Sequence, residues 1–324
     1  MRGFLDTAGE HLAIECSIPW VMDLLAEGAA GELRRAGSRD ASVGVRVEAD
    51  RRSFEIDGWE PLARGAWRRN GEVVIENACT AGFDLHLKHA PEHAQFTFRW
   101  RPPPRDRVAA RLLRSRFHLL ARATLMQYPV LWWAGTRGRV PLHASVCVVA
   151  GSVPLVTAPS GIGRSTVVLA EAARGGQATG DNLAVSDGIT VWGLVEPTRV
   201  TGGGGRRMPH GRQEGALHHR AESLVPDRIV VLRRGQSDHS SLSSCSTEAA
   251  TRSLVTSTYM AGELRRYWVF AATLAAGLGH GPAHPPITEI AAALAGRLPC
   301  YSLALGRRPG ASLSEVLDAV EVAA

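Results

Sequence analysis

The stretch PLHASVCVVAGSVPLVTAPSGIGRSTVVLAEAARGGQATGDNLAVSDGIT, residues 141–190, decides how the rest of the chain is interpreted. It places a loop of small residues, 158–163, between an apolar segment expected to be a strand (153–157) and an amphipathic segment expected to be a helix from Arg164. Such a loop can direct several backbone N–H groups at one anion, which also meets the positive end of the helix dipole. The order of strand, loop and helix therefore predicts a phosphate-binding loop suited to a nucleotide polyphosphate.

The loop departs from the usual pattern G-x-x-x-x-G-K-[ST] at two of its four fixed positions. Ala158 replaces the first glycine, and Arg164 replaces the lysine. Arginine is not equivalent to lysine at a tight phosphate site, because its guanidinium is a larger planar group. The chain uses arginine almost everywhere, however, and Lys88 is its only lysine among 37 basic residues. A tight strand-to-helix turn without a ligand is the alternative interpretation.

Two further residues lie at informative distances from this loop. His143 precedes Arg164 by 21 residues, and Asp181 follows it by 17. The series LHAS, APSGIGRST, a helix and GDN resembles the HPr kinase/phosphorylase family and its relatives found beside peptide natural-product genes. The resemblance is specific over residues 139–200, weak from there to about 260, and not usable before 130.

The resemblance implies a role for each matched residue. His143 would position or neutralise the active-site carboxylate and the transferred phosphate, and Arg164 stands where the family has its phosphate-binding lysine. Ser165 stands where the family has the hydroxyl that binds Mg²⁺. Asp181 and Asn182 stand where the family has two acids, so Asp181 is the remaining candidate for the base and for a second metal ligand. The implied nucleotide-binding residues are Pro159, Ser160, Gly161, Ile162, Gly163, Arg164, Ser165 and Thr166.

These assignments predict a phosphotransferase that uses ATP and Mg²⁺ and acts on a hydroxyl of a peptide or small-molecule acceptor, in the tailoring of a ribosomal peptide product. One alternative is a degenerate kinase fold that binds a peptide or a nucleotide without phosphoryl transfer, based on the departures at Ala158, Arg164 and Asn182. A phosphate-releasing enzyme on the same scaffold is a third hypothesis. Glu196 is either a further acid beside the metal or a surface carboxylate.

The composition is that of a soluble globular protein, with 45% hydrophobic and 21% charged residues. Five widely spaced cysteines form no CxxC pair or Cys/His cluster, which predicts reduced thiols in a cytoplasmic protein. The first residues do not resemble a secretory signal, and the longest apolar run, near 269–278, is too short for a membrane span.

The formal net charge of +6 favours acidic partners such as nucleotides or acidic peptides. The sequence carries no signature of a nucleic-acid-binding module, so nucleic acid is not favoured as a partner. A homo-oligomer stays open.

We predict an α/β fold with two domains. Residues 1–105 are expected to form a small α+β domain, with helical pieces over 1–36 and short antiparallel strands over 42–100, one of them at 53–56. The helix breaker RPPPR, residues 101–105, marks the boundary. Residues 106–324 are expected to form an HPr-kinase-like phosphate-loop domain, a mixed sheet flanked by helices.

Within the second domain, one long amphipathic helix is expected over 107–127. Its apolar face should pack on the nucleotide-binding part. Its basic face should be solvated or dock an acidic peptide; this face comprises Arg107, Arg111, Arg114, His118 and Arg122. Asp187-Gly188 predicts a tight hairpin. Residues 201–220, rich in glycine and arginine, predict a loop that closes over the nucleotide or is disordered. Later helices are expected at 248–258, 261–278, 287–297 and 312–321, and strands at 229–232 and 301–305.

Overall fold

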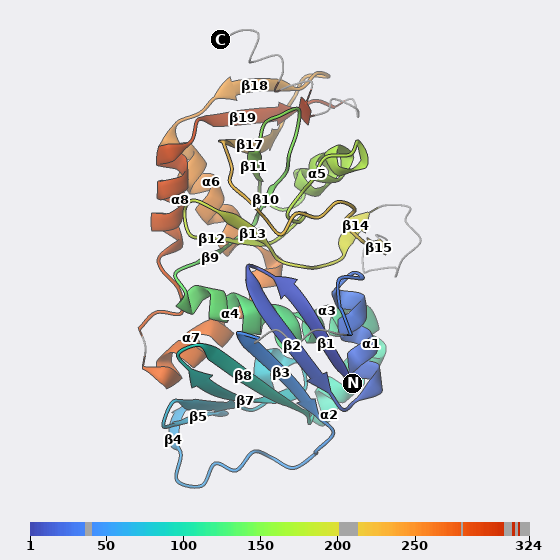
Figure 1. The fold of residues 1–324 in the computed structure, drawn as a ribbon, viewed down its shortest axis with the longest axis vertical. Coiled ribbons are helices and arrows are strands. Elements are labelled where there is room, and N and C mark those ends of the chain that lie inside the picture. Colours follow the sequence, from blue (N-terminus) through green and yellow to red (C-terminus); the bar gives the residue numbers. More distant parts are fainter. Residues whose placement is uncertain (36–40, 201–212, 280, 308–312, 315–316, 318–324) are drawn as a thin grey trace.

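The computed structural model describes residues 1–324 except 36–40, 201–212, 280, 308–312, 315–316 and 318–324. The described elements are arranged along the longest axis of the molecule, with one large sheet at each end and smaller sheets between them (Figure 1). One end is built on an eight-stranded sheet from the N-terminal third of the chain, and the other on a five-stranded sheet from the C-terminal part. The fold is therefore α/β, with helices against both sheets.

The eight-stranded sheet is mixed, with the order β1-β2-β3-β8-β7-β6-β5-β4. Strands β2, β3 and β8 pair in parallel, and the other neighbours are antiparallel. Buried and less buried side chains alternate along β8, as expected where one face of a sheet meets a core. The strands are β1 (Arg2–Thr7), β2 (Glu10–Cys16), β3 (Val43–Glu48), β4 (Glu60–Ala63), β5 (Ala66–Arg69), β6 (Glu72–Ile75), β7 (Phe83–Ala90) and β8 (His93–Trp100).

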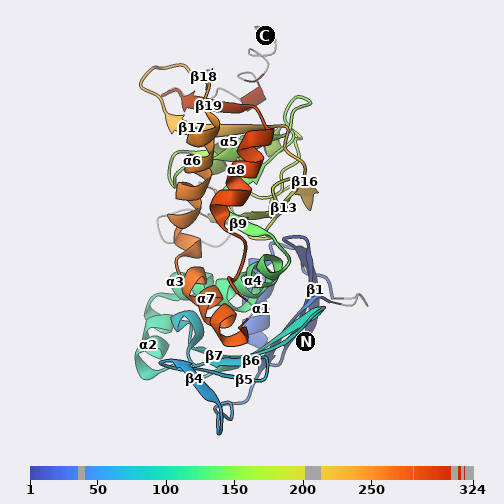
Figure 2. The same cartoon turned by 90° about the vertical axis from the view of Figure 1, so that its left-hand side faces the viewer.

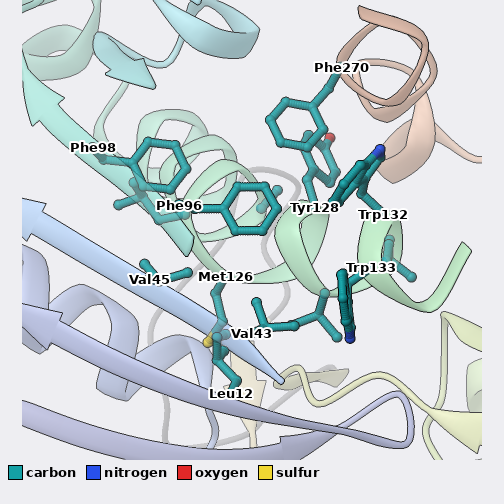
Figure 3. Close-up of a cluster of buried hydrophobic side chains, with 14 of the residues drawn as sticks. Leu12, Val43, Val45, Phe96, Phe98, Met126, Tyr128, Trp132, Trp133 and Phe270 are labelled. Carbon is teal, nitrogen blue, oxygen red and sulfur yellow. The ribbon is translucent and has the colours of Figure 1, made fainter. Parts of the chain in front are cut away.

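Helices from three parts of the chain cover this sheet (Figure 1). They are α1 (Pro19–Gly28), then α2 (Pro104–Leu112), α3 (Arg114–Arg122), a π-helical turn (Ala123–Gln127) and α4 (Tyr128–Thr136), and finally α7 (Tyr267–Leu278). Almost every residue of α4 is buried, because the helix packs on the sheet on one side and on α7 on another. Figure 3 shows this core, where Phe96 lies edge-on to Trp132, at 5.8 Å between ring centroids, and Tyr128 meets Phe270.

The five-stranded sheet has the order β10-β11-β17-β19-β18, and its central strands β11, β17 and β19 are parallel. Leu155 faces a cluster formed with α6 and α8, which lie side by side in Figure 2, while Val156 faces a second cluster with α5. Burial on both faces explains the unbroken apolar sequence of β11. The elements are β10 (Ala144–Val146), β11 (Pro154–Thr157), α5 (Arg164–Ala173), β17 (Arg228–Arg234), β18 (Ser241–Ser244), α6 (Thr247–Tyr259), α8 (Ile287–Arg297) and β19 (Cys300–Leu305).

Smaller sheets join the two ends. One is four-stranded, with the order β16-β13-β12-β9, and the other pairs β14 with β15. They comprise β9 (Val140–Leu142), β12 (Ala184–Ser186), β13 (Val191–Gly193), β14 (Thr198–Val200), β15 (Gln213–Gly215) and β16 (Ser223–Leu224). Two single turns of 3-10 helix, Ala78–Thr80 and Gly262–Leu264, complete the described elements. None of the described helices is both long and apolar enough to cross a membrane.

Several predicted elements are confirmed. The phosphate-loop context is a strand, β11, followed by the loop and α5. The hairpin at Asp187-Gly188 joins β12 to β13, with Gly188 at a φ of +95°. Helices α6, α7 and α8 and strands β17 and β19 lie close to their predicted ranges. Of the predicted loop at 201–220, residues 201–212 lie outside the described part, and the loop prediction is wrong for Gln213–Gly215, which form strand β15 paired with β14. Most of the predicted helix 312–321 also lies outside the described part.

The helical prediction for residues 1–36 is wrong over its first half, which forms the hairpin β1–β2 before α1. Ala8 and Gly9 both have positive φ, the geometry of a two-residue turn that suits the twist of a hairpin. The strand predicted at 53–56 is also wrong. Phe54 instead packs under the Arg99 guanidinium, 4.2 Å from its ring centroid, so its side chain is used without strand pairing.

The single helix predicted over 107–127 is wrong in its continuity and in the packing of both its faces. It breaks at Leu113, which has φ −111° and ψ 48°, and it continues as a π-helical turn after Arg122. From Phe117 onward its apolar face packs into the core cluster of the eight-stranded sheet, whereas Leu112 and Leu113 are exposed. Its basic face is partly buried, since Arg122 bonds Glu27 and both carboxylate oxygens of Glu214.

We expect Leu131→Ala to lower the free energy of unfolding by about 2–5 kcal/mol, because it would leave a cavity in a close-packed helix. Leu131 in α4 is fully buried, whereas Leu112 is 78% exposed. The matched variant Leu112→Ala removes the same atoms from the surface, so its change should stay within about 0.5 kcal/mol. Urea unfolding followed by circular dichroism measures both. Equal losses would contradict the central position of α4.

Candidate functional site

The loop between β11 and α5 contains two glycines with positive φ. Gly161 and Gly163 have φ of +84° and +125°, a region that other residues rarely enter. The loop is open to solvent at Ser160 and Gly161. Helix α5 begins directly after Gly163, and no side chain caps its N-terminus. Because the first N–H groups of a helix have no partner within the helix, this end is suited to bind an anion.

Arg164, the residue in the place of the usual lysine, turns inward from the first position of α5. Its Nη1 donates to the main-chain oxygen of His143 at 2.6 Å, and its Nε donates to that of Asp181 at 3.2 Å. Its Nη2 donates to Oδ1 of Asn182 at 3.1 Å. The side chain is therefore a link between three segments, and only 6% of the residue is exposed. Burial lowers the pKa of Arg164 to about 10, which still leaves it charged at neutral pH.

Ser165 and Asp181 are brought together by the same arrangement. The Ser165 hydroxyl donates to the main-chain oxygen of Asp181 at 3.4 Å, and it also interacts with the Asp181 carboxylate. Asp181 is 4% exposed, and this burial raises the pKa of its carboxyl above the ordinary value. The Asn182 side chain is occupied as well, since it accepts from Arg164 and donates to Glu196.

A group of charges that the sequence does not identify as a set continues from Asp181. Glu196 accepts from the main-chain N–H of Leu183 at 3.2 Å, and its second oxygen lies 4.0 Å from Arg199. Arg199 pairs with Glu263 at 2.7 Å. The sequence left Glu196 as either a further acid beside the metal or a surface carboxylate. Its side chain is buried, so it is not a surface carboxylate. Arg199 lies only three residues beyond it, whereas nothing in the sequence near Glu263 indicates that it belongs here.

The two acids of this group differ in charge state. Burial raises the pKa of Glu196 to about 8, and the nearby Asp181 charge adds to this effect. Burial also acts to raise the pKa of Glu263, but the charge and hydrogen bond of Arg199 outweigh it and hold that pKa below its ordinary value. The pKa values of the two acids are therefore shifted in opposite directions, toward the neutral form for Glu196 and toward the charged form for Glu263.

His143 lies between β9 and β10 and borders the same site. Its main-chain N–H donates to the Thr258 hydroxyl at 3.0 Å, while its Nδ1 is buried and finds no partner among the described residues. Burial, followed by the Arg164 charge, lowers the pKa of His143 to about 4. A neutral imidazole cannot neutralise a carboxylate by charge. Hydrogen bonding is the contribution that remains open to it.

A cavity of about 610 Å³ adjoins this group of charges. Glu196, Arg199 and Glu263 form part of its wall, and α2 and α3 form the opposite wall. In the described part of the chain, no three His, Cys, Asp or Glu side chains converge in a way that could hold a metal by themselves.

We expect Arg164→Ala to lower the free energy of unfolding by about 2–4 kcal/mol, because three buried acceptors lose their donor. Arg164→Lys should restore only part of this loss, since one ammonium cannot span all three. Arg2→Ala, which removes an exposed ion pair with Glu15, is the control and should cost less than about 1 kcal/mol. Denaturant unfolding measures the stability of each variant, and equal effects at positions 164 and 2 would refute the linking role.

The charge state of Glu196 predicts a pH dependence of stability. A carboxyl with a raised pKa holds a proton in the folded state that the unfolded state has released, so stability falls as pH rises through about 8. His143 has a lowered pKa and acts in the opposite direction, but only below its ordinary value of 6.5. Between pH 6.5 and 8 we therefore expect the native protein to lose stability relative to Glu196→Gln. Parallel curves for the two proteins would show that Glu196 is ionised in the fold.

Comparisons with known proteins give one remote similarity to report. No family model matches the sequence, and no curated protein matches it. Among solved structures, that of the Hpr(Ser) kinase/phosphatase from Coxiella burnetii is similar over 56% of this chain and 91% of that chain, with 11% sequence identity and a TM-score of 0.29. We transfer no residue role and no activity across a similarity of this size.

Proposed function

We propose that this chain binds the phosphates of ATP at residues 158–166 and transfers the terminal phosphoryl group to a hydroxyl of a peptide or small-molecule acceptor. One observation carries the proposal. Ser165 and Asp181 lie together at the N-terminus of α5, and this helix end follows a glycine loop and has no side-chain cap. A hydroxyl and a carboxylate beside an anion-binding helix end are groups that phosphoryl transfer uses.

Mg²⁺ fits the groups present. This ion takes one or two protein oxygen ligands and leaves its other positions to water and substrate phosphates, so a site without three converging acids is suited to it. Ser165 and Asp181 are the residues we assign to hold it. When bound, the ion neutralises charge that builds up on the phosphate oxygens during transfer.

Asp181 is the proposed base, because burial raises the pKa of its carboxyl toward the range in which a base works best at neutral pH. The acceptor oxygen forms a bond to the γ-phosphorus while its proton moves to the Asp181 carboxylate. The bond from the γ-phosphorus to the bridging oxygen breaks, and ADP leaves with the bonding electrons. Burial raises the pKa of Glu196 too, which favours its neutral form beside the Asp181 carboxylate.

We assign Arg164 a different role from that of the phosphate-binding lysine in the usual loop pattern. Two of its hydrogen bonds hold the main chain at His143 and Asp181, and the third holds the Asn182 side chain. The expectation that Arg164 binds the β- and γ-phosphates does not fit these bonds. Loop amides and the end of α5 supply the positive potential instead. Arg164 positions Asp181 against the loop, and His143 helps to position the same segment.

The internal hydrogen bonds of Arg164 also favour a second function, the binding of a nucleotide or peptide without phosphoryl transfer. A cation that is committed to the protein gives little stabilisation to charge developing on a phosphoryl group. Asn182 also cannot act as an acid or base, and its side chain is committed to Arg164 and Glu196. This second function predicts affinity for a ligand and no product.

Calorimetry with Mg-ATP and a ³¹P assay of transfer to serine-bearing peptides separate the two functions. Gly163→Ala should weaken ATP binding about tenfold or more, because a φ of +125° strains any other residue by roughly 1–3 kcal/mol. Asp181→Asn should lower transfer by about 10²–10⁴-fold. It should weaken Mg-ATP binding less than Gly163→Ala does, because Ser165 and the phosphates still hold the ion.

Gly296→Ala is the matched control, since its added methyl meets open space and its φ is ordinary, so ATP affinity should not change. ATP binding by the native protein without transfer to any peptide would leave only the second function. No ATP binding at all would remove both the nucleotide site and the transfer.

A further inference from the structure

The cavity beside the candidate site is lined in part by the charged residues that surround Asp181. Glu196 faces the cavity, and it also bonds the Asn182 side chain and the Leu183 main chain directly after Asp181. Arg199 and Glu263 border the cavity as well. A molecule in this space therefore contacts Glu196, which is bonded to the segment that directly follows Asp181, while the loop is linked to Asp181 through Ser165.

The charges of the wall do not cancel. Two arginines are used internally, because Arg122 is bonded by Glu214 and Arg199 by Glu263. Arg116 and Arg265, in contrast, are exposed and make no ion pair with the described residues. The complete set of charged residues in the wall is Asp106, Arg116, Arg122, Arg199, Glu196, Glu214, Glu263, Arg265 and Arg266.

The remaining wall is apolar and suits an amphipathic ligand. It is lined by Leu113, which lies at the break between α2 and α3 and is 50% exposed, and by Phe117 and Leu120 of α3. A space of about 610 Å³ falls within the range of ordinary ligand pockets. It can hold a short peptide segment, with its carbon chains on the leucines and its charged ends at the arginines.

We infer that this cavity is the acceptor site, and that the acceptor is an acidic peptide segment whose carboxylates meet Arg116 and Arg265 while its hydroxyl residue lies at Glu196. This inference rests on the proposed transfer function for the role of the hydroxyl. The binding of the acidic segment itself does not require ATP.

The test uses two synthetic peptides, each with one serine, flanked by glutamates in the first and by glutamines in the second. Calorimetry on the full chain without nucleotide should show binding of the glutamate peptide and at least tenfold weaker binding of the glutamine peptide. Arg116→Gln and Arg265→Gln should each weaken the glutamate peptide about fivefold. Arg64→Gln, which removes an exposed arginine in the turn between β4 and β5, should have no effect.

Three results would overturn the inference. Equal affinity for both peptides would show that the carboxylates are not recognised, and unchanged affinity in both cavity variants would place the peptide elsewhere. A loss of Mg-ATP affinity in those variants, with peptide binding unaffected, would make the cavity a nucleotide site. Lack of ATP binding by the native protein would remove the transfer function but leave the peptide result intact, so the two failures are distinguishable.

Discussion

A guanidinium that leaves water must find acceptors for its N–H groups, and the acceptors that Arg164 finds determine the layout of the candidate site. They come from His143, before the loop, and from Asp181 and Asn182, after the helix. The segments that give the sequence its resemblance are thus held together by Arg164, one of the residues that depart from the pattern. A lysine could satisfy only part of this set, since its ammonium is a single point on a flexible stem.

Burial of several ionisable groups in one place is costly, and it changes what each group can do. Asp181 and Glu196 hold protons more firmly than exposed acids, while Glu263 is kept ionised by Arg199. Neighbouring carboxyls whose proton affinities are pushed apart are common in sites that move protons. This separation depends on Arg199 lying next to Glu263 and farther from Glu196, at 2.7 Å and 4.0 Å.

Short-range signals in the sequence predicted the parts of this protein that depend on neighbours along the chain. The loop, α5 and the hairpin at Asp187-Gly188 are of this kind, because glycine placement and apolar runs specify them locally. The hairpin of β1 and β2 was missed because its turn uses Ala8, a residue that rarely has positive φ. Glu263 and the cavity could not be found, since they depend on contacts between segments far apart. The inward turn of Arg164 likewise depends on acceptors supplied by the fold.

Helix α7 packs on the eight-stranded sheet although it lies far from that sheet in the sequence, and this separation affects folding during synthesis. Gly277 of this helix packs so closely on Val73 and Leu62 that an added methyl would lie 2.5 Å from a carbon of Val73. On the ribosome, however, the last strand of that sheet is complete at Trp100, whereas α7 starts at Tyr267. At ordinary rates of translation, this delay is on the order of ten to thirty seconds. During that time the apolar face that α7 covers stays exposed to solvent, so chaperone supply during synthesis becomes a determinant of yield.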